Sequence, residues 1–168
     1  MTSMAGFNII DTAKSSLEFM GLGDTVWVQD SCWQHVVASG AILKGDLVVI
    51  TNGEVATSAT NTNALNNTGT ALMKQFGIAQ YAFADTERGL VLVGPFERNP
   101  VSNFPFTVNC EAGAVQTGLL YTSAIAGRIS NVATSAARIQ NLALVADTVA
   151  GPALTACRAV DRVTAAGG

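Results

Sequence analysis

The chain is dominated by short segments in which hydrophobic and polar positions alternate, as they do in half-buried β-strands. This alternation begins at residues 25–29 and returns at several places downstream. A compact apolar run at 46–51 is followed by Asn52-Gly53, a pair in which both residues tolerate positive φ and favour a tight hairpin turn. We predict a strand at 46–51 that turns back into a second strand at 54–57.

More strands are predicted on either side of the proline-bearing segment 95–105, which interrupts regular structure and is the expected connection between two halves. Before it, residues 76–83 and 89–94 have strand character and flank a charged turn at 85–88. The spacing of apolar residues at 133–146 also fits a helix, but the internal repeat described below favours a strand at 142–147. The strands predicted after the connection cover residues 106–109, 119–123, 128–131, 142–147 and 153–163.

Two segments depart from this β pattern. Apolar residues within 9–20 are spaced like one face of a short helix, which Gly21-Leu22-Gly23 ends. Residues 1–30 are therefore expected to form an N-terminal arm that packs either on its own domain or on a neighbouring subunit. Residues 57–70 are polar and rich in turn formers, and an exposed loop is expected there.

The most informative feature of the sequence is an internal duplication. Residues 40–60 align with 113–134 as two copies of one strand-turn-strand unit, in which Gly53-Glu54-Val55 matches Gly127-Arg128-Ile129 after one extra residue. Turns and strands repeat, whereas no catalytic residue type does. The predicted fold class is all-β, with two related small β-barrel or β-clip-like modules that follow the N-terminal arm. The predicted boundaries are 1–30 for the arm, 31–100 for the first module, and 101–168 for the second module with its flexible C-terminal tail.

Charge and composition argue against several classes of function. Only 12% of the residues are charged, about half the share typical of soluble domains, so much of the surface consists of uncharged residues suited to flat protein contacts. The net charge of −3 and the scattered basic residues argue against direct binding of nucleic acid. Neither a secretion signal nor an apolar run of membrane-spanning length is present, so we expect a protein that is made and used without export and does not contact a membrane.

Candidate catalytic and metal-binding groups are sparse. Cys32, Cys110 and Cys157 lie far apart without metal-ligand spacing, and buried free thiols are favoured over a disulfide. The single histidine, His35, follows Cys32 by three residues, so the two side chains face each other only if this segment is helical. Lys44-Gly45-Asp46 matches an adhesion tripeptide but is interpreted as a turn, because the second copy keeps the glycine and loses the charges. We predict no enzyme, no cofactor and no metal site.

Aromatic residues and acid-base pairs are the candidates for contacts with other proteins. The aromatic residues are expected in the core or at a seam between subunits. Glu97-Arg98 and Asp161-Arg162 occupy equivalent repeat positions, either as surface ion pairs or as contacts at a subunit interface. The candidate interface residues are Trp27, Trp33, Arg98, Phe104, Phe106 and Arg162.

Three segments carry a resemblance to a known family, namely residues 41–50 (AILKGDLVVI), 76–80 (FGIAQ) and 89–93 (GLVLV). In this series of a Gly-Asp turn and short apolar strands, the chain resembles the capsid decoration, or cement, proteins of tailed bacteriophages. The resemblance is best over residues 40–95. Such a family has no active-site residue to carry over.

The resemblance implies a structural virion protein that acts as a homo-oligomer, expected to be a homotrimer. It would bind the major capsid protein on the outer capsid surface and stabilise the shell against the pressure of packaged DNA. Synthesis is then expected in the cytoplasm of a bacterial host. The alternative from a different class is a receptor- or glycan-binding β module that displays the 57–70 loop.

Overall fold

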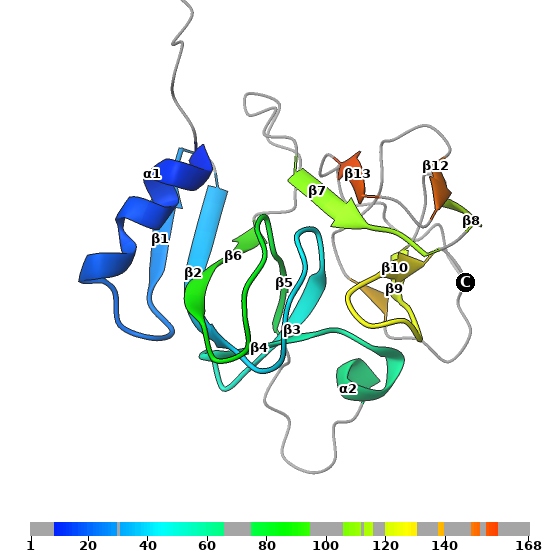
Figure 1. Cartoon of the computed structure of the whole chain (residues 1–168), viewed down its shortest axis with the longest axis horizontal. Helices are drawn as coiled ribbons and strands as arrows, with labels where there is room; N and C mark the ends of the chain where they lie inside the picture. Colours follow the sequence, from blue (N-terminus) through cyan, green and yellow to red (C-terminus); the bar gives the residue numbers. More distant parts are fainter. Residues whose placement is uncertain are drawn as a thin grey trace, which may run out of the picture.

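The structure is a computed structural model of the chain, and it is mostly strand with little helix, as predicted. Figure 1 shows a β-barrel in the centre, with the N-terminal elements on one side and the strands of the C-terminal half on the other. The described residues are 9–29, 31–65, 75–94, 106–111, 113–115, 120–130, 138–139, 149–151 and 154–157.

Five strands close the barrel in the order β2-β4-β3-β5-β6, and β6 pairs back with β2. The pairing of β2 with β4 is parallel, whereas the other pairs in the ring are antiparallel. A further strand, β1, pairs with β2 outside the ring. The bounds are β1 (Thr25–Val28), β2 (Ser31–Ala38), β3 (Leu47–Thr51), β4 (Val55–Ser58), β5 (Gln75–Ile78) and β6 (Arg88–Gly94).

The barrel interior is one of two hydrophobic clusters among the described residues. On β3, Val48 and Ile50 belong to the interior. Leu47 and Val49 belong to the second cluster, which lies outside the barrel and is called the outer hydrophobic cluster below. Both faces of β3 are therefore buried, which explains why its sequence is continuously apolar rather than alternating. The buried members of the interior are Val36, Ala38, Ile42, Val48, Ile50, Ala56, Ala79, Phe83 and Val91.

Glycine and asparagine shape the turns before and after β3. Asn52 and Gly53 have φ angles of 53° and 75°, and the Glu54 N–H donates to the Thr51 carbonyl at 3.1 Å. The hairpin predicted from the Asn52-Gly53 pair is therefore confirmed. Gly45 has a φ of 88° in the turn that leads into β3, a conformation that favours glycine.

The N-terminal segment packs on the barrel of its own chain. It contains α1 (Ile9–Ser15), the 3-10 helix η1 (Leu17–Phe19) and β1, so a short helix lies where helical spacing predicted one. Ala13 is fully buried in the outer hydrophobic cluster. The Lys14 ammonium lies 4.3 Å from the centroid of the Tyr81 ring, a cation-π contact between α1 and the loop after β5.

The described strands of the C-terminal half pair as three small sheets, β10-β9-β11, β12-β8 and β13-β7. Strands are present at predicted positions 106–109, 119–123 and 128–131, whereas residues 142–147 lie outside the described residues. The β9–β10 pair is antiparallel, as the β3–β4 pair is, but the described strands do not test the duplication further, so it stays a prediction, as do the domain boundaries. The bounds are β7 (Phe106–Asn109), β8 (Gly113–Val115), β9 (Leu120–Thr122), β10 (Ile129–Ser130), β11 (Arg138–Ile139), β12 (Val149–Gly151) and β13 (Leu154–Cys157).

The segment predicted as an exposed 57–70 loop is partly structured and packed. It contains the end of β4 and a short helix, α2 (Asn61–Leu65), while residues 66–70 lie outside the described residues. Ala59 is fully buried and Ala64 nearly so, both in the outer hydrophobic cluster. The Asn61 N–H donates to the Ser123 carbonyl at 3.0 Å. The expectation of an exposed loop is thus wrong for residues 57–65, because small apolar side chains among the polar ones fix this segment to the C-terminal half.

Candidate functional site

Large hydrophobic side chains that remain exposed are the clearest candidates for contacts with another molecule. Among the residues whose side chains the structure describes, the exposed fractions are 87% for Phe19, 60% for Trp27, 64% for Leu43 and 44% for Ile125. They fall into two groups. Phe19 and Trp27 lie in the N-terminal segment. Leu43 lies in the turn before β3 of the barrel, and Ile125 lies in the turn between β9 and β10 of the C-terminal half.

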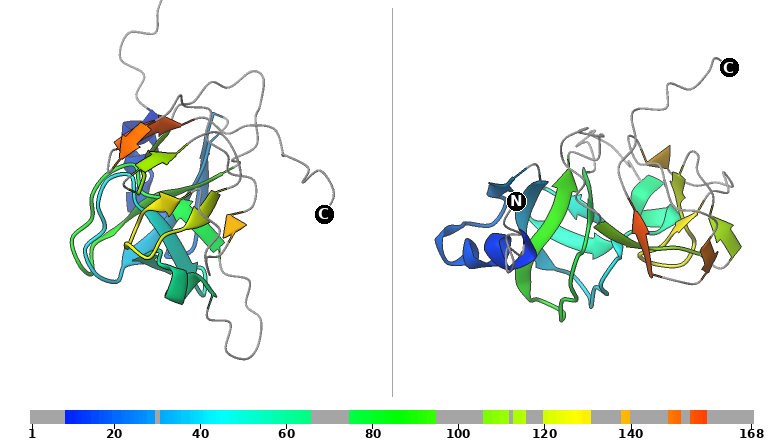
Figure 2. Two further views of the ribbon diagram at one scale, coloured as in Figure 1. Left: turned by 90° about the vertical axis from the view of Figure 1, so that its right-hand side faces the viewer. Right: turned by 90° about the horizontal axis from the view of Figure 1, so that it is seen from above.

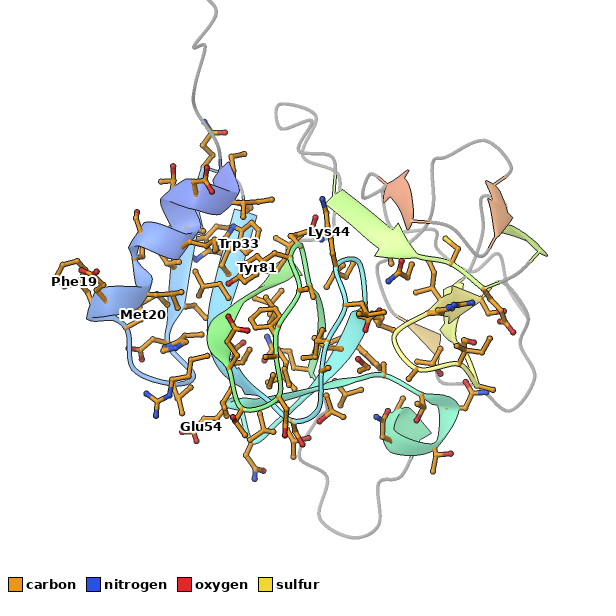
Figure 3. The ribbon with its side chains drawn as sticks, viewed as in Figure 1. Phe19, Met20, Trp33, Lys44, Glu54 and Tyr81 are labelled. Carbon is orange, nitrogen blue, oxygen red and sulfur yellow. The ribbon has the colours of Figure 1, made fainter. Side chains whose placement is uncertain are left out.

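The two residues of the first group do not share a side of β1 with α1, because Val26 and Val28 pack with α1 and Trp27, between them, points the opposite way. Phe19 ends η1 and points away from the barrel at the far end of this segment (Figure 3). Trp27 lies on β1, which pairs with β2 along one edge and, among the described strands, with no strand along the other. An edge strand with an exposed aromatic side chain favours contact with another protein.

We call the second group, together with Lys44 and Arg128, the junction face. Leu43 and Lys44 lie in the turn before β3, and Ile125 and Arg128 in the turn between β9 and β10. The two turns are held together, since the Leu47 N–H donates to the Gly127 carbonyl at 2.7 Å. Figure 3 shows Lys44, and Figure 1 the β9–β10 turn, on the side of the barrel away from α1, while Figure 2 gives two further views of these elements.

Beneath the junction face, a buried carboxylate connects the barrel to the C-terminal half. Asp46 is only 4% exposed and accepts three hydrogen bonds, from the Leu43 N–H (3.0 Å), the Ser58 hydroxyl (2.9 Å) and the Asn109 side-chain amide (2.8 Å). These donors come from the turn before β3, from β4 and from β7, so a single side chain joins three elements. Gly127 lies directly against this carboxylate, and a Cβ at that position would overlap it.

This geometry bears on the Lys44-Gly45-Asp46 tripeptide. A receptor of an adhesion motif would need the aspartate exposed, but the carboxylate of Asp46 is buried and already hydrogen-bonded. The interpretation of the tripeptide as a turn is therefore confirmed. Its aspartate supports the fold, which explains why a charged residue occurs in an otherwise apolar run.

The predicted interface residues have different locations. Trp33 is fully buried on β2, and its indole N–H donates to the Ser31 hydroxyl at 2.9 Å, so it is a core residue with no surface to offer a partner. Trp27 is exposed, and its role at an interface stays a prediction. Phe106 begins β7, and only its backbone is described. Arg98, Phe104 and Arg162 lie outside the described residues.

The other exposed residues had weak signals in the sequence. Phe19 falls outside the helical face formed by the buried apolar residues of the same segment. Leu43 and Ile125 are apolar residues within turns, where a side chain has little protein around it. A search for apolar residues out of phase with their element, or in a turn, would have found all three.

The Cys32 and His35 side chains point to opposite faces of β2, because the two residues are three positions apart on a strand that pairs with β1 over residues 31–34 and with β6 over residues 33–37. The His35 Nδ1 lies 3.0 Å from the Gly21 carbonyl oxygen, so the ring is fixed by the backbone of the N-terminal segment. Cys32 is hydrogen-bonded to Thr25 on the neighbouring strand. Cys110 is buried, as expected of a cysteine in the core, whereas Cys32 is only partly buried.

Burial raises the pKa of the Cys32 thiol above its ordinary value, and the hydrogen bond with Thr25 opposes this only in part. We expect iodoacetamide to modify Cys32 more slowly than an unstructured cysteine near pH 8, with the rate rising at higher pH, because the thiolate is the reactive form. Site-resolved mass spectrometry measures this rate, with Cys32→Ser to assign the modified peptide. A rate at Cys32 equal to that of the unstructured cysteine would contradict the prediction.

Among the described residues, no three or more histidine, cysteine, aspartate or glutamate side chains gather as metal ligands would. None of the described helices has the length and apolar character needed to span a membrane. Comparison with protein-family models, with curated proteins and with solved structures finds no match to this chain.

Proposed function

We propose that this chain is a structural virion protein that binds the outer surface of a tailed-phage capsid as a homo-oligomer and stabilises the shell. The observation that carries the proposal is the set of exposed large hydrophobic side chains, Phe19, Trp27, Leu43 and Ile125, on a chain of low charge density. Burying such side chains in a protein contact is favourable, and few charges lose water when they do so.

The residues that resemble decoration proteins coincide with the barrel. Residues 41–50 span the turn before β3 and most of that strand, residues 76–80 include most of β5, and residues 89–93 lie in β6. These three strands are neighbours in the ring. A closed barrel also has no free edge along its ring, which suits a rigid part that must keep its shape under load.

The alternative, a receptor- or glycan-binding module, has less support from residues 57–65. That hypothesis relied on an exposed loop at 57–70, and residues 57–65 instead include part of β4 and the packed helix α2.

Two measurements test the proposed function. Light scattering coupled to size exclusion is expected to give three times the 17.3 kDa of one chain. The chain is then expected to sediment with capsid shells assembled without it and to raise the temperature at which they break. A chain that is monomeric at every concentration would contradict the homo-oligomer, and an oligomer that neither sediments with the shells nor stabilises them would contradict the capsid role.

A further inference from the structure

We propose that Asn52 is a site of spontaneous deamidation, and that the buried Gln34 side chain lowers the rate of this reaction by restraining the Asn52-Gly53 turn. The proposal concerns a covalent modification of the barrel and is independent of the proposed function. The reactants are the turn itself and water.

The residue types at this turn are those that the reaction requires. In deamidation, the backbone nitrogen of the following residue attacks the side-chain carbonyl carbon of asparagine, and this attack is least hindered when the following residue is glycine. Asn52 is the only asparagine in the sequence that precedes a glycine. Its side chain is exposed, so water reaches the amide. Glu54, next to the pair in the chain, lies at the lower edge of the barrel in Figure 3.

The reaction balances with water as its one co-reactant. The Gly53 nitrogen forms a bond to Cγ of Asn52 and gives up its proton, while the bond between Cγ and Nδ2 breaks, so ammonia leaves and a succinimide ring closes. Water then adds to one of the two ring carbonyls and opens the ring to aspartate or to isoaspartate. Neither step oxidises or reduces the chain.

The closed turn opposes ring closure. Asn52 and Gly53 have φ angles of 53° and 75°, and the Glu54 N–H donates to the Thr51 carbonyl at 3.1 Å. The succinimide ring ties the Gly53 nitrogen to the Asn52 side chain, so the peptide plane between the two residues must rotate before the ring can close. The rate of deamidation is therefore set by how often the turn opens as well as by the chemical step.

Gln34 on β2 restrains this turn. The Gln34 side chain is only 4% exposed, and its amide nitrogen donates to the Gly53 carbonyl at 2.5 Å. Gly23 of the N-terminal segment lies against the same carbonyl, since a Cβ on Gly23 would be 3.3 Å from its oxygen. Rotation at Gly53 thus costs the hydrogen bond to a buried side chain, which would be left without its acceptor.

Deamidation changes a hairpin that supplies two neighbouring strands of the barrel ring. Both products add a negative charge, and isoaspartate also adds one carbon atom to the backbone of the turn. Because the length of a hairpin turn sets the register of its strands, we expect chains with isoaspartate at this position to unfold at a lower temperature than unmodified chains. Calorimetry of separated modified and unmodified chains measures the difference.

Ageing of the full chain in mildly alkaline buffer tests the site. Fragment mass spectra of the digested chain measure conversion at each asparagine, and Asn63 is the internal control, because it precedes alanine and its amide is hydrogen-bonded to Thr60 and Ser58. Conversion at Asn52 is expected to exceed that at Asn63 in the folded chain and to rise further in urea. Conversion at Asn52 no faster than at Asn63 overturns the site, and equal rates with and without urea overturn the restraint by the turn.

The variant Gln34→Met tests the role of Gln34, since methionine has a similar volume but donates no hydrogen bond. Deamidation at Asn52 is expected to become about fivefold faster, the effect of one typical hydrogen bond on an opening equilibrium, while the rate at Asn63 stays unchanged. Val36→Ala is the matched control, because Val36 is fully buried on the same strand and its truncation destabilises the barrel without removing a hydrogen bond to the turn. Far-UV circular dichroism checks folding, and Gln34→Leu replaces Gln34→Met if that variant does not fold.

The two variants are compared at the same free energy of unfolding, which urea adjusts. An unchanged rate in Gln34→Met, or an equal increase in Val36→Ala, overturns the role of Gln34. A specific increase in Gln34→Met supports it.

Discussion

Replacing Asp46 with alanine is expected to lower the free energy of unfolding by about 3 kcal/mol, because three donors lose a buried acceptor and each unsatisfied group contributes about 1 kcal/mol or more. The donors are the Leu43 N–H, the Ser58 hydroxyl and the Asn109 side-chain amide, and only the amide has a second acceptor, the Lys44 carbonyl at 3.0 Å, among the hydrogen bonds of the described residues. Urea unfolding with linear extrapolation measures the loss. Asp46→Asn is also expected to be destabilising, since its amide nitrogen would face a donor.

The matched control is Asp85→Ala. The Asp85 carboxylate also accepts a backbone hydrogen bond, from the Gly40 N–H at 2.7 Å, but this pair is exposed to water. Water replaces the lost acceptor there, so the free energy of unfolding is expected to fall by less than about 1 kcal/mol. Equal losses for Asp46→Ala and Asp85→Ala would show that the buried carboxylate has no special role in joining the two halves.

Features set by neighbouring residues were predictable from the sequence. The Asn52-Gly53 turn was found because positive φ at both positions restricts the residue types that fit. The turn at Gly45 follows from the same restriction, and the glycine at the matching position of the second repeat copy supported it. The helix at Ile9–Ser15 was indicated by its apolar spacing, because one face had to meet the barrel.

Features set by distant residues were not predictable. The barrel closes through pairing of β2 with β6 and, in parallel, with β4, and neither pairing leaves a local sequence pattern. The role of Asp46 depends on Asn109, which is far away in the chain. The same holds for α2, since the burial of Ala59 and Ala64 requires the C-terminal half to be present.

The two tryptophans show this limit most clearly. Trp27 and Trp33 lie on paired strands, β1 and β2, and both were expected at a core or a seam. One is 60% exposed and the other fully buried, because Trp33 lies in the cluster covered by α1 while no described element covers Trp27. Alternation along a strand predicts that successive side chains face opposite sides of the sheet, but it does not predict which side is covered by another element.

Trp33→Ala is therefore expected to lower the free energy of unfolding by about 3–5 kcal/mol, the range for removing a large aromatic side chain from a core. The loss combines the buried surface of the indole, the cavity left between α1 and the barrel, and the hydrogen bond to Ser31. Trp27→Ala removes the same side chain from an exposed position and is expected to change stability by less than about 1 kcal/mol when the protein is dilute enough to be monomeric. Urea unfolding followed by far-UV circular dichroism gives both values. Similar losses for the two variants would mean that the N-terminal segment does not cover Trp33 in solution, and the surface assigned to Trp27 would then be part of a larger exposed area.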